Sequence, residues 1–153
     1  MDVKLINPFI NATINVLETM AFMSVEAGKP YVKKDNTAVG DVTGVIGLTG
    51  VAHGTIAVTF EENCILTVVS NMLGEAMKTL NEDISDAVGE LTNMISGQAR
   101  VGLAELGLDF VGSVPAIIVG EKHIIKHLTD EPVVAVPFTS SAGPFTIEFC
   151  FER

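Results

Sequence analysis

The sequence predicts an α+β fold, in which a mainly antiparallel sheet has helices packed on it within a single domain, residues 1–153. Apolar residues recur with the period of a helix in segments before residue 107, whereas they alternate with the period of a strand in the last third of the chain. The strand-like runs follow one another through short turns, which favours antiparallel neighbours. Because 48% of the residues are hydrophobic, the chain can bury a substantial core.

Composition narrows the classes of partner. The formal net charge is −10, with 19 acidic and 9 basic residues, and no basic cluster extends beyond Lys33-Lys34. Neither nucleic acid nor an anionic membrane surface is therefore an expected partner. No apolar run is long enough to cross a membrane, and the N-terminus lacks the pattern of a signal peptide, so we expect a cytoplasmic protein. Cys64 and Cys150 lie in apolar surroundings and are predicted to be reduced core residues.

The N-terminal segment predicts a helix followed by a strand. Asn7-Pro8 is a typical helix start, with asparagine as the N-cap and proline at the first helical position, and the helix should end by Gly28. Residues 30–36 are predicted to form a strand in which Lys33 and Lys34 are solvated.

Two apolar runs, Val42–Thr49 and Thr55–Phe60, predict a β-hairpin, and the second alternates as a half-buried strand does. Gly44 and Gly47 interrupt the first run and indicate a bulge or close packing. A second helix should then begin at Glu61-Glu62, where carboxylates suit the positive end of the helix dipole, and should end at Gly74.

The last third of the chain predicts strands over 110–114, 116–119, 123–126, 132–139 and 145–152. Pro137 should lie at a sheet edge or a bulge, because proline cannot donate to a strand ladder. His123 and His127 would be splayed in such a strand, so a metal site is not expected there. The run Phe145–Phe151 is long, apolar on one face and poorly protected by charge, which leads us to expect a symmetric homodimer.

The helical pattern at 84–106 is the most informative stretch of the chain. One stripe of it is apolar: Ile84, Val88, Leu91, Ile95, Ala99, Gly102 and Leu106. Roughly opposite lie Asp86, Glu90, Asn93, Gly97 and Arg100. The helix should begin at Asn81-Glu82-Asp83, with Asp83 and Asp86 approximating a capping box, and should end at Gly107.

The outer face of this helix presents a carboxylate, Glu90, and a carboxamide, Asn93, one turn apart. Gly89 and Gly97 flank the pair although glycine destabilises a helix, which suggests that another molecule comes close to this face. The alternative is an ordinary solvated face, since most amphipathic helices expose polar residues that only contact water.

The chemistry open to such a pair is limited. The chain lacks the glycine-rich nucleotide loops, Cys-x-x-Cys and a nucleophile elbow, so it offers no obvious nucleophile or metal of its own. An asparagine amide can instead hold a water in line with a phosphoryl group, while a nearby carboxylate binds a cation on the partner. Glu90 and Asn93 would then complete a site that mostly belongs to another protein.

At these residues the sequence resembles a known family. The pattern Asp86-x3-Glu90-x2-Asn93, continued by Met94-Ile-Ser-Gly97 and followed later by Pro115, resembles the signature of the CheC/CheX/FliY phosphatases. Asn7-Pro-Phe-Ile and Val16-Leu-Glu-Thr-Met20 resemble the CheX branch, and the similarity covers nearly the whole chain. A single copy of the motif is present, which also fits the CheX branch.

The resemblance implies a CheC/CheX-like fold and a phosphorylated CheY-like receiver domain as substrate. It implies that Asn93 positions the hydrolytic water and that Glu90 pairs with a lysine of the regulator. Asp86 and Gly97 would be supporting residues, Asp86 through helix capping or positioning. The chain itself would bind no cofactor, because the regulator holds the Mg²⁺, and it would form a homodimer through its sheet.

Two alternatives remain. The chain could be a non-catalytic module that binds receiver domains, or a component of the flagellar switch. A turnover assay separates the enzyme from the binding module, whereas a switch component would be expected to carry additional domains or binding segments.

Overall fold

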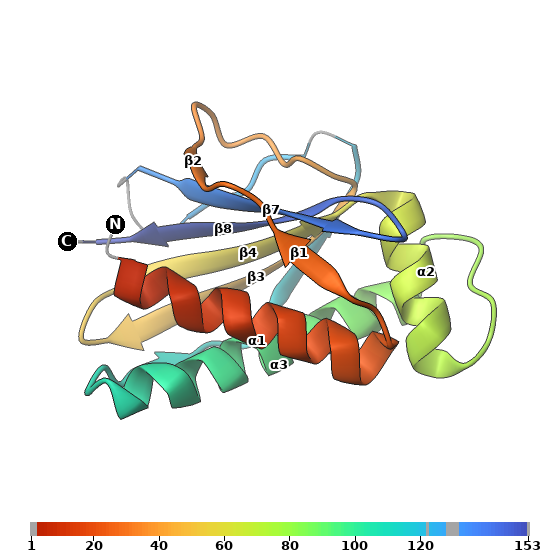
Figure 1. Ribbon diagram of the computed structural model, residues 1–153. Helices are drawn as coiled ribbons and strands as arrows, with labels where there is room; N and C mark the ends of the chain where they lie inside the picture. Colours follow the sequence, from red (N-terminus) through yellow and green to blue (C-terminus); the bar gives the residue numbers. More distant parts are fainter. Residues whose placement is uncertain (1–2, 122, 128–131, 153) are drawn as a thin grey trace.

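Three helices cover one face of an antiparallel sheet, as the fold-class prediction required (Figure 1). The computed structural model describes residues 3–121, 123–127 and 132–152. Its elements are α1 Val3–Ala21, β1 Val25–Ala27, β2 Tyr31–Val32, β3 Val42–Gly50, β4 Gly54–Phe60, α2 Glu62–Leu73, α3 Glu82–Glu105, β5 Phe110–Gly112, β6 Ala116–Val119, β7 Val134–Ser140 and β8 Phe145–Phe151. The sheet order is β1-β7-β8-β4-β3-β5, with β2 also pairing β7 and β6 also pairing β3. None of the described helices is both long and apolar enough to cross a membrane.

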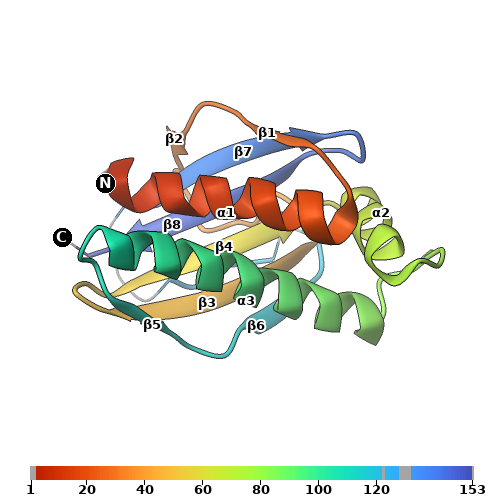
Figure 2. The ribbon, with the colours of Figure 1, turned by 60° about the horizontal axis from the view of Figure 1, so that its bottom comes forward.

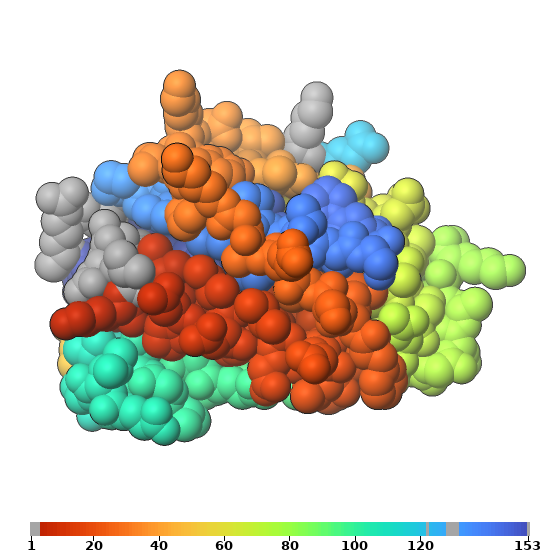
Figure 3. Space-filling model, viewed as in Figure 1, coloured from red at the N-terminus to blue at the C-terminus, as the bar shows by residue number. Residues whose placement is uncertain are grey.

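The core lies between the sheet and the helices. Along β8, the core contains Phe145, Ile147, Phe149 and Phe151. The ring of Phe149 meets the ring of Phe9 on α1 edge-on, with 5.4 Å between the two ring centroids. The helices α1 and α3 pack side by side along the sheet (Figures 2 and 3). The 3.6-residue apolar pattern of both helices is explained by this burial.

The predicted start of the first helix is wrong. Helix α1 begins by Val3, so Asn7 is not its N-cap and Pro8 lies inside the helix. A proline there removes one backbone hydrogen bond, but the turn before it buries Ile6 and packs Leu5 against the core. Burial of these side chains outweighs the local signal at Asn7-Pro8. The predicted end by Gly28 agrees with the observed end at Ala21.

The predicted hairpin and second helix are confirmed. Strands β3 and β4 pair antiparallel, and a methyl group on Gly44 would lie 3.1 Å from Cβ of Thr92 on α3. Close packing of helix on sheet is therefore the reason for this glycine. Gly74 ends α2 in the left-handed conformation, with φ of 71°.

Strand β4 is buried on both faces, not half-buried as its alternation predicted. Residues 33–38, before β3, and residues 123–127, after β6, cover the side of the sheet that faces away from the helices, which we call the far face (Figure 1). Ala38 and Ile125, one from each segment, pack on Ala57 of β4 there. Residues 123–126 form no strand, and Ile124 makes only an isolated bridge to Thr37.

The side chain of Lys33 is only 5% exposed, which corrects the prediction that it is solvated. Its Nζ donates to a carboxylate oxygen of Glu148 at 2.9 Å and to the carbonyl of Thr37 at 2.6 Å. His127 lies 3.3 Å from the other carboxylate oxygen of Glu148, whereas His123 contacts Thr43. The two histidines therefore have different partners on the far face.

Strand β8 is central, between β7 and β4, so the edge that motivated the predicted homodimer does not exist there. The ends of the sheet are β1 with β2 and β5 with β6. Pro137 lies in β7 where the outer neighbours β1 and β2 leave a gap, since they pair with β7 on either side of it. This gap accommodates a residue without an N–H group. Cys64 and Cys150 are buried and form no disulfide, as predicted.

Candidate functional site

Helix α3 presents the predicted polar residues to solvent. Asp86, Glu90 and Asn93 are exposed and Gly97 is half-buried. The opposite stripe is buried from Ile84 to Ala99, as expected, but it fails at the end of the helix, where Leu106 is 57% exposed. Helical geometry therefore places the carboxylate of Glu90 and the amide of Asn93 one turn apart on a convex surface.

The start of α3 differs in detail from the prediction. Asn81 is the N-cap, and its side-chain oxygen accepts from the backbone N–H of Ile84 at 3.2 Å. Asp83 and Asp86 form no capping box, and the carboxylate of Asp86 is exposed. Asp86 therefore does not cap the helix. Gly107, with φ of 81°, ends it as predicted.

Neighbours on both sides fix the orientation of α3. Toward α1, Nδ2 of Asn15 donates to the side-chain oxygen of Gln98 at 2.7 Å. Toward the sheet, Gly89 lies over Ile117 of β6, where an added methyl group would be 3.6 Å from the isoleucine Cδ1. The polar row thus projects from a helix that is held by α1 and the sheet together (Figure 2).

Glu90 and Asn93 are free to contact another molecule. Within the described residues, neither side chain makes a hydrogen bond or an ion pair. An exposed amide without a partner retains two donors and an acceptor, and the carboxylate retains all of its acceptor positions. The pair is well suited to meet complementary groups on a partner.

Arg100 belongs to the same outer row, but the sequence assigned it no role. It is half-buried, its guanidinium lies against Gly112 of β5, and its Nε atom is buried without a hydrogen-bond partner among the described residues. The sequence shows that Arg100 lies on the same side of the helix as Asn93, whereas only the structure reveals the contact of Arg100 with β5.

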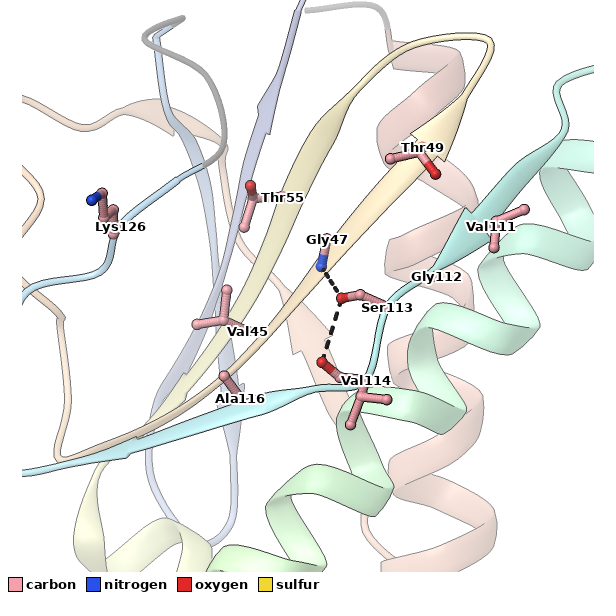
Figure 4. Close-up of a pocket in the computed structure, with 10 residues that line it drawn as sticks. All are labelled: Val45, Gly47, Thr49, Thr55, Val111, Gly112, Ser113, Val114, Ala116 and Lys126. Carbon is pink, nitrogen blue, oxygen red and sulfur yellow. Dashed lines mark hydrogen bonds between the residues drawn. The ribbon is translucent and has the colours of Figure 1, made fainter.

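Beside α3 the chain bends between β5 and β6. Both strands pair with β3, and Ser113 at the bend accepts from the backbone N–H of Gly47 at 2.9 Å (Figure 4). Val114 is 88% exposed and Pro115, part of the family signature, is half-buried. Pro115 therefore lies between two strands, β5 and β6, that both contact the helix carrying the polar row.

A cavity of about 370 Å³ lies on the far face of the sheet, with Lys126 at its margin (Figure 4). Its walls come from β3, β4, β5, the bend and the start of β6: Val45, Gly47, Thr49, Thr55, Val111, Gly112, Ser113, Val114 and Ala116. Neither Glu90 nor Asn93 lines it. The polar row is therefore an exposed helix surface and not part of the wall of this cavity.

The remaining candidate groups are placed elsewhere. Burial raises the pKa of the Cys64 thiol to about 11, so it is not an activated nucleophile at neutral pH. No three His, Cys, Asp or Glu side chains within the described ranges are grouped so that they could hold a metal ion.

Comparison with known proteins identifies the family. A family model described as chemotaxis phosphatase CheX matches residues 42–139, well over half of the chain. The chain belongs to the CheX family. The matched residues include all of α3 with its polar row, together with β3 to β6.

Individual relatives agree with this assignment. The crystal structure of chemotaxis protein CheX from Desulfovibrio desulfuricans is 51% identical, with a TM-score of 0.90, over 97% of this chain and 99% of that one. The CheY-P phosphatase CheX of Thermotoga maritima is 28% identical over 127 residues, 82% of each chain. A CheX–CheY–BeF3–Mg²⁺ complex from Borrelia burgdorferi shares the fold with a TM-score of 0.82, at 24% identity over 97% of each chain.

Proposed function

We propose that this protein accelerates hydrolysis of the aspartyl phosphate on a CheY-like response regulator. The main supporting observation is the pair Glu90 and Asn93. Both side chains are exposed, have no partner among the described residues, and lie one turn apart on a helix whose opposite side is buried. The known properties of two relatives support the proposal. One is a CheY-P phosphatase, and the structure of the other was solved in a complex with CheY.

Asn93 is proposed to position the attacking water. A carboxamide cannot itself attack phosphorus, but it donates and accepts at once, so it can hold a water in line with the phosphoryl group. Such orientation lowers the activation barrier, because the water has already lost its translational and rotational freedom before it attacks. The convex surface around Asn93 allows the side chain to enter a recessed site on the regulator.

Glu90 is proposed to pair with a lysine of the regulator. A charge-assisted hydrogen bond one turn from Asn93 would set the register in which the amide enters the site. Asp86, one turn earlier, adds negative charge for the same lysine, and Gly97 leaves room for the regulator to approach. Mg²⁺ would be held by carboxylates of the regulator, and in this proposal the chain supplies no ligand to it.

We also propose a homodimer in the cytoplasm, where phosphorylated receiver domains act. Two-fold pairing is the commonest solution for open sheet edges, and the described sheet has edges at β1 with β2 and at β5 with β6. Light scattering at micromolar concentration tests this, and a monomer mass would contradict it.

The test of function is a turnover assay with purified protein, Mg²⁺ and a panel of phosphorylated receiver domains. Faster loss of phosphate from at least one receiver than its own spontaneous rate is the expected result. If a beryllofluoride-loaded receiver binds but its phosphorylated form is not hydrolysed faster, the protein is a binding module and the proposal is wrong.

A further inference from the structure

Arg100 is the cation in the polar row of α3, and it makes no polar contact with the residues that the structure describes. Among the described residues its guanidinium makes neither a hydrogen bond nor an ion pair, and its Nε is shielded from water. A shielded donor without an acceptor is destabilising, so natural proteins rarely leave one in place without a use for it. The chain also carries a net charge of −10, yet no carboxylate of the described structure neutralises this arginine.

The fold holds the guanidinium in a defined place. Side chains on a helix lean toward its N-terminus, and Nη2 of Arg100 lies 4.0 Å from the position of a methyl group on Gly97, one turn back. On its other side, a methyl group on Gly112 would be 3.2 Å from Cζ. The lack of a side chain on Gly112 thus leaves room between α3 and β5 for the planar group, whereas a methyl group on Gly97 would meet it only in ordinary van der Waals contact.

This position places a positive charge about one turn beyond Asn93, on the side opposite Glu90. Along the helix the surface therefore runs from carboxylates at Asp86 and Glu90, through the amide of Asn93, to a guanidinium. A partner that fits this order has a cation on one side of its reactive group and an anion on the other.

We propose that Arg100 binds an acidic side chain at the rim of the receiver's active site and so fixes the direction in which Asn93 enters it. The inference rests on the proposed function. The guanidinium lies back against β5 while Asn93 projects from the helix, so Arg100 meets the rim and not the phosphoryl group. A planar guanidinium also pairs with a carboxylate through two parallel hydrogen bonds, which makes the contact directional.

The test compares Arg100→Met with Lys34→Met, which changes the net charge by the same amount on an exposed residue of the far-face segment. Methionine keeps the aliphatic packing of the arginine stem. Binding of a beryllofluoride- and Mg²⁺-loaded receiver and turnover of its phosphorylated form are measured for each variant. Arg100→Met should weaken binding and raise the half-saturating concentration by about tenfold, with the maximal rate within about twofold, and Lys34→Met should change neither by more than about twofold.

Gly112→Ala provides a second variant that keeps the charge but displaces the guanidinium. It should weaken binding by roughly threefold in the wild-type background and have no further effect in Arg100→Met, because both changes act on one contact. Circular dichroism verifies the fold of each variant, and Arg100→Lys should restore part of the affinity.

The other outcomes distinguish failure of the inference from failure of the proposed function. Unchanged binding by Arg100→Met would show that Arg100 contacts no part of the receiver. A lower maximal rate with unchanged binding would assign it to the phosphoryl group instead of the rim. Wild-type protein that binds the receiver without turnover would overturn the proposed function alone, since the binding comparison still decides the role of Arg100. Wild-type protein that binds no receiver would overturn both.

Discussion

The outer face of α3 and the far face of the sheet contain similar polar side chains, which are exposed and unpaired on the helix but buried and paired on the sheet within the described residues. On the far face, Glu148 is fully buried and is bonded to Lys33, with His127 beside it. On α3, Glu90 and Asn93 are exposed and bonded to nothing in the described structure. The sequence alone did not separate the two groups, because it predicted Lys33 to be as solvated as Glu90.

The difference indicates which polar residues serve folding and which serve recognition. A charge inside a protein must be paired, so Lys33 and Glu148 are explained by each other. An exposed polar side chain needs no partner, and for Glu90 and Asn93 the reason to infer one is their order on a single helix with Arg100. The following substitutions test this division, from the largest expected effect to the smallest.

Asn93→Ala should nearly abolish acceleration of receiver dephosphorylation. Loss of the group that orients the water should cost about 100- to 10,000-fold in maximal rate. Since Asn93 is exposed and makes no hydrogen bond within the described residues, the free energy of unfolding should stay within about 0.5 kcal/mol of wild type. Single-turnover kinetics and urea denaturation measure the two quantities. A variant with most of its activity would show that Asn93 is not the water-positioning group.

Glu148→Ala should have the converse effect. It leaves the ammonium of Lys33 buried without its carboxylate, which should lower the free energy of unfolding by about 3 kcal/mol. The maximal rate per folded molecule should remain close to wild type, because α3 lies on the other side of the sheet. Denaturant unfolding measures the loss, with Glu148→Gln as a control that retains a hydrogen-bond acceptor. A loss below about 1 kcal/mol would mean that the far-face cluster contributes little to folding.

Glu90→Gln should affect binding more than turnover. A contact that is equally strong before and during the reaction changes affinity, so the half-saturating concentration of phosphorylated receiver should rise roughly threefold to tenfold. Added salt should weaken the variant less than wild type. Glu18→Gln, an equivalent charge change on an exposed residue of α1, is the matched control. Normal binding of the beryllofluoride-loaded receiver with a reduced rate would assign Glu90 to the chemical step.

Gly97→Ala should increase the stability of the fold and weaken binding of the receiver. A methyl group there meets only Nη2 of Arg100, at 4.0 Å, so the helix should gain up to about 1 kcal/mol of stability. The same methyl group should hinder approach of the receiver and raise the half-saturating concentration. Gly44→Ala is the contrasting control, because it forces α3 away from β3 and should destabilise the fold. Unchanged receiver affinity in Gly97→Ala would show that this glycine leaves no room for a partner.

Much of this architecture was predictable from local patterns. The third helix, its outer face and the β3–β4 hairpin follow from periodicity, because each buries one side of a regular element. The candidate site residues Glu90 and Asn93 were identified by their spacing and motif, and the structure places them on the exposed face of α3 as predicted.

The errors arose where a distant segment decides the outcome. Lys33 is buried because Glu148, far along the chain, needs a counter-ion. Strand β8 is central because β7 and β4 reach it from both directions, and spacing along the chain does not reveal that. Pro8 lies within α1 because the preceding turn packs on the core. Similarly, the position of the Arg100 guanidinium depends on its contact with Gly112 of β5, and the sequence alone does not reveal that contact.

The packing of α3 has a consequence for how the site can move. The buried side chains on its inward side are Val88, Leu91, Ile95 and Ala99. Each turn of the helix that carries a residue of the polar row therefore also carries a buried residue. The row therefore has no local opening motion of its own, and its amide protons should exchange with solvent only when the whole domain unfolds. Most flexible binding loops must become ordered when they meet a partner, whereas this surface is already part of a regular, packed helix. If the proposed function is correct, any adjustment during an encounter comes from the regulator.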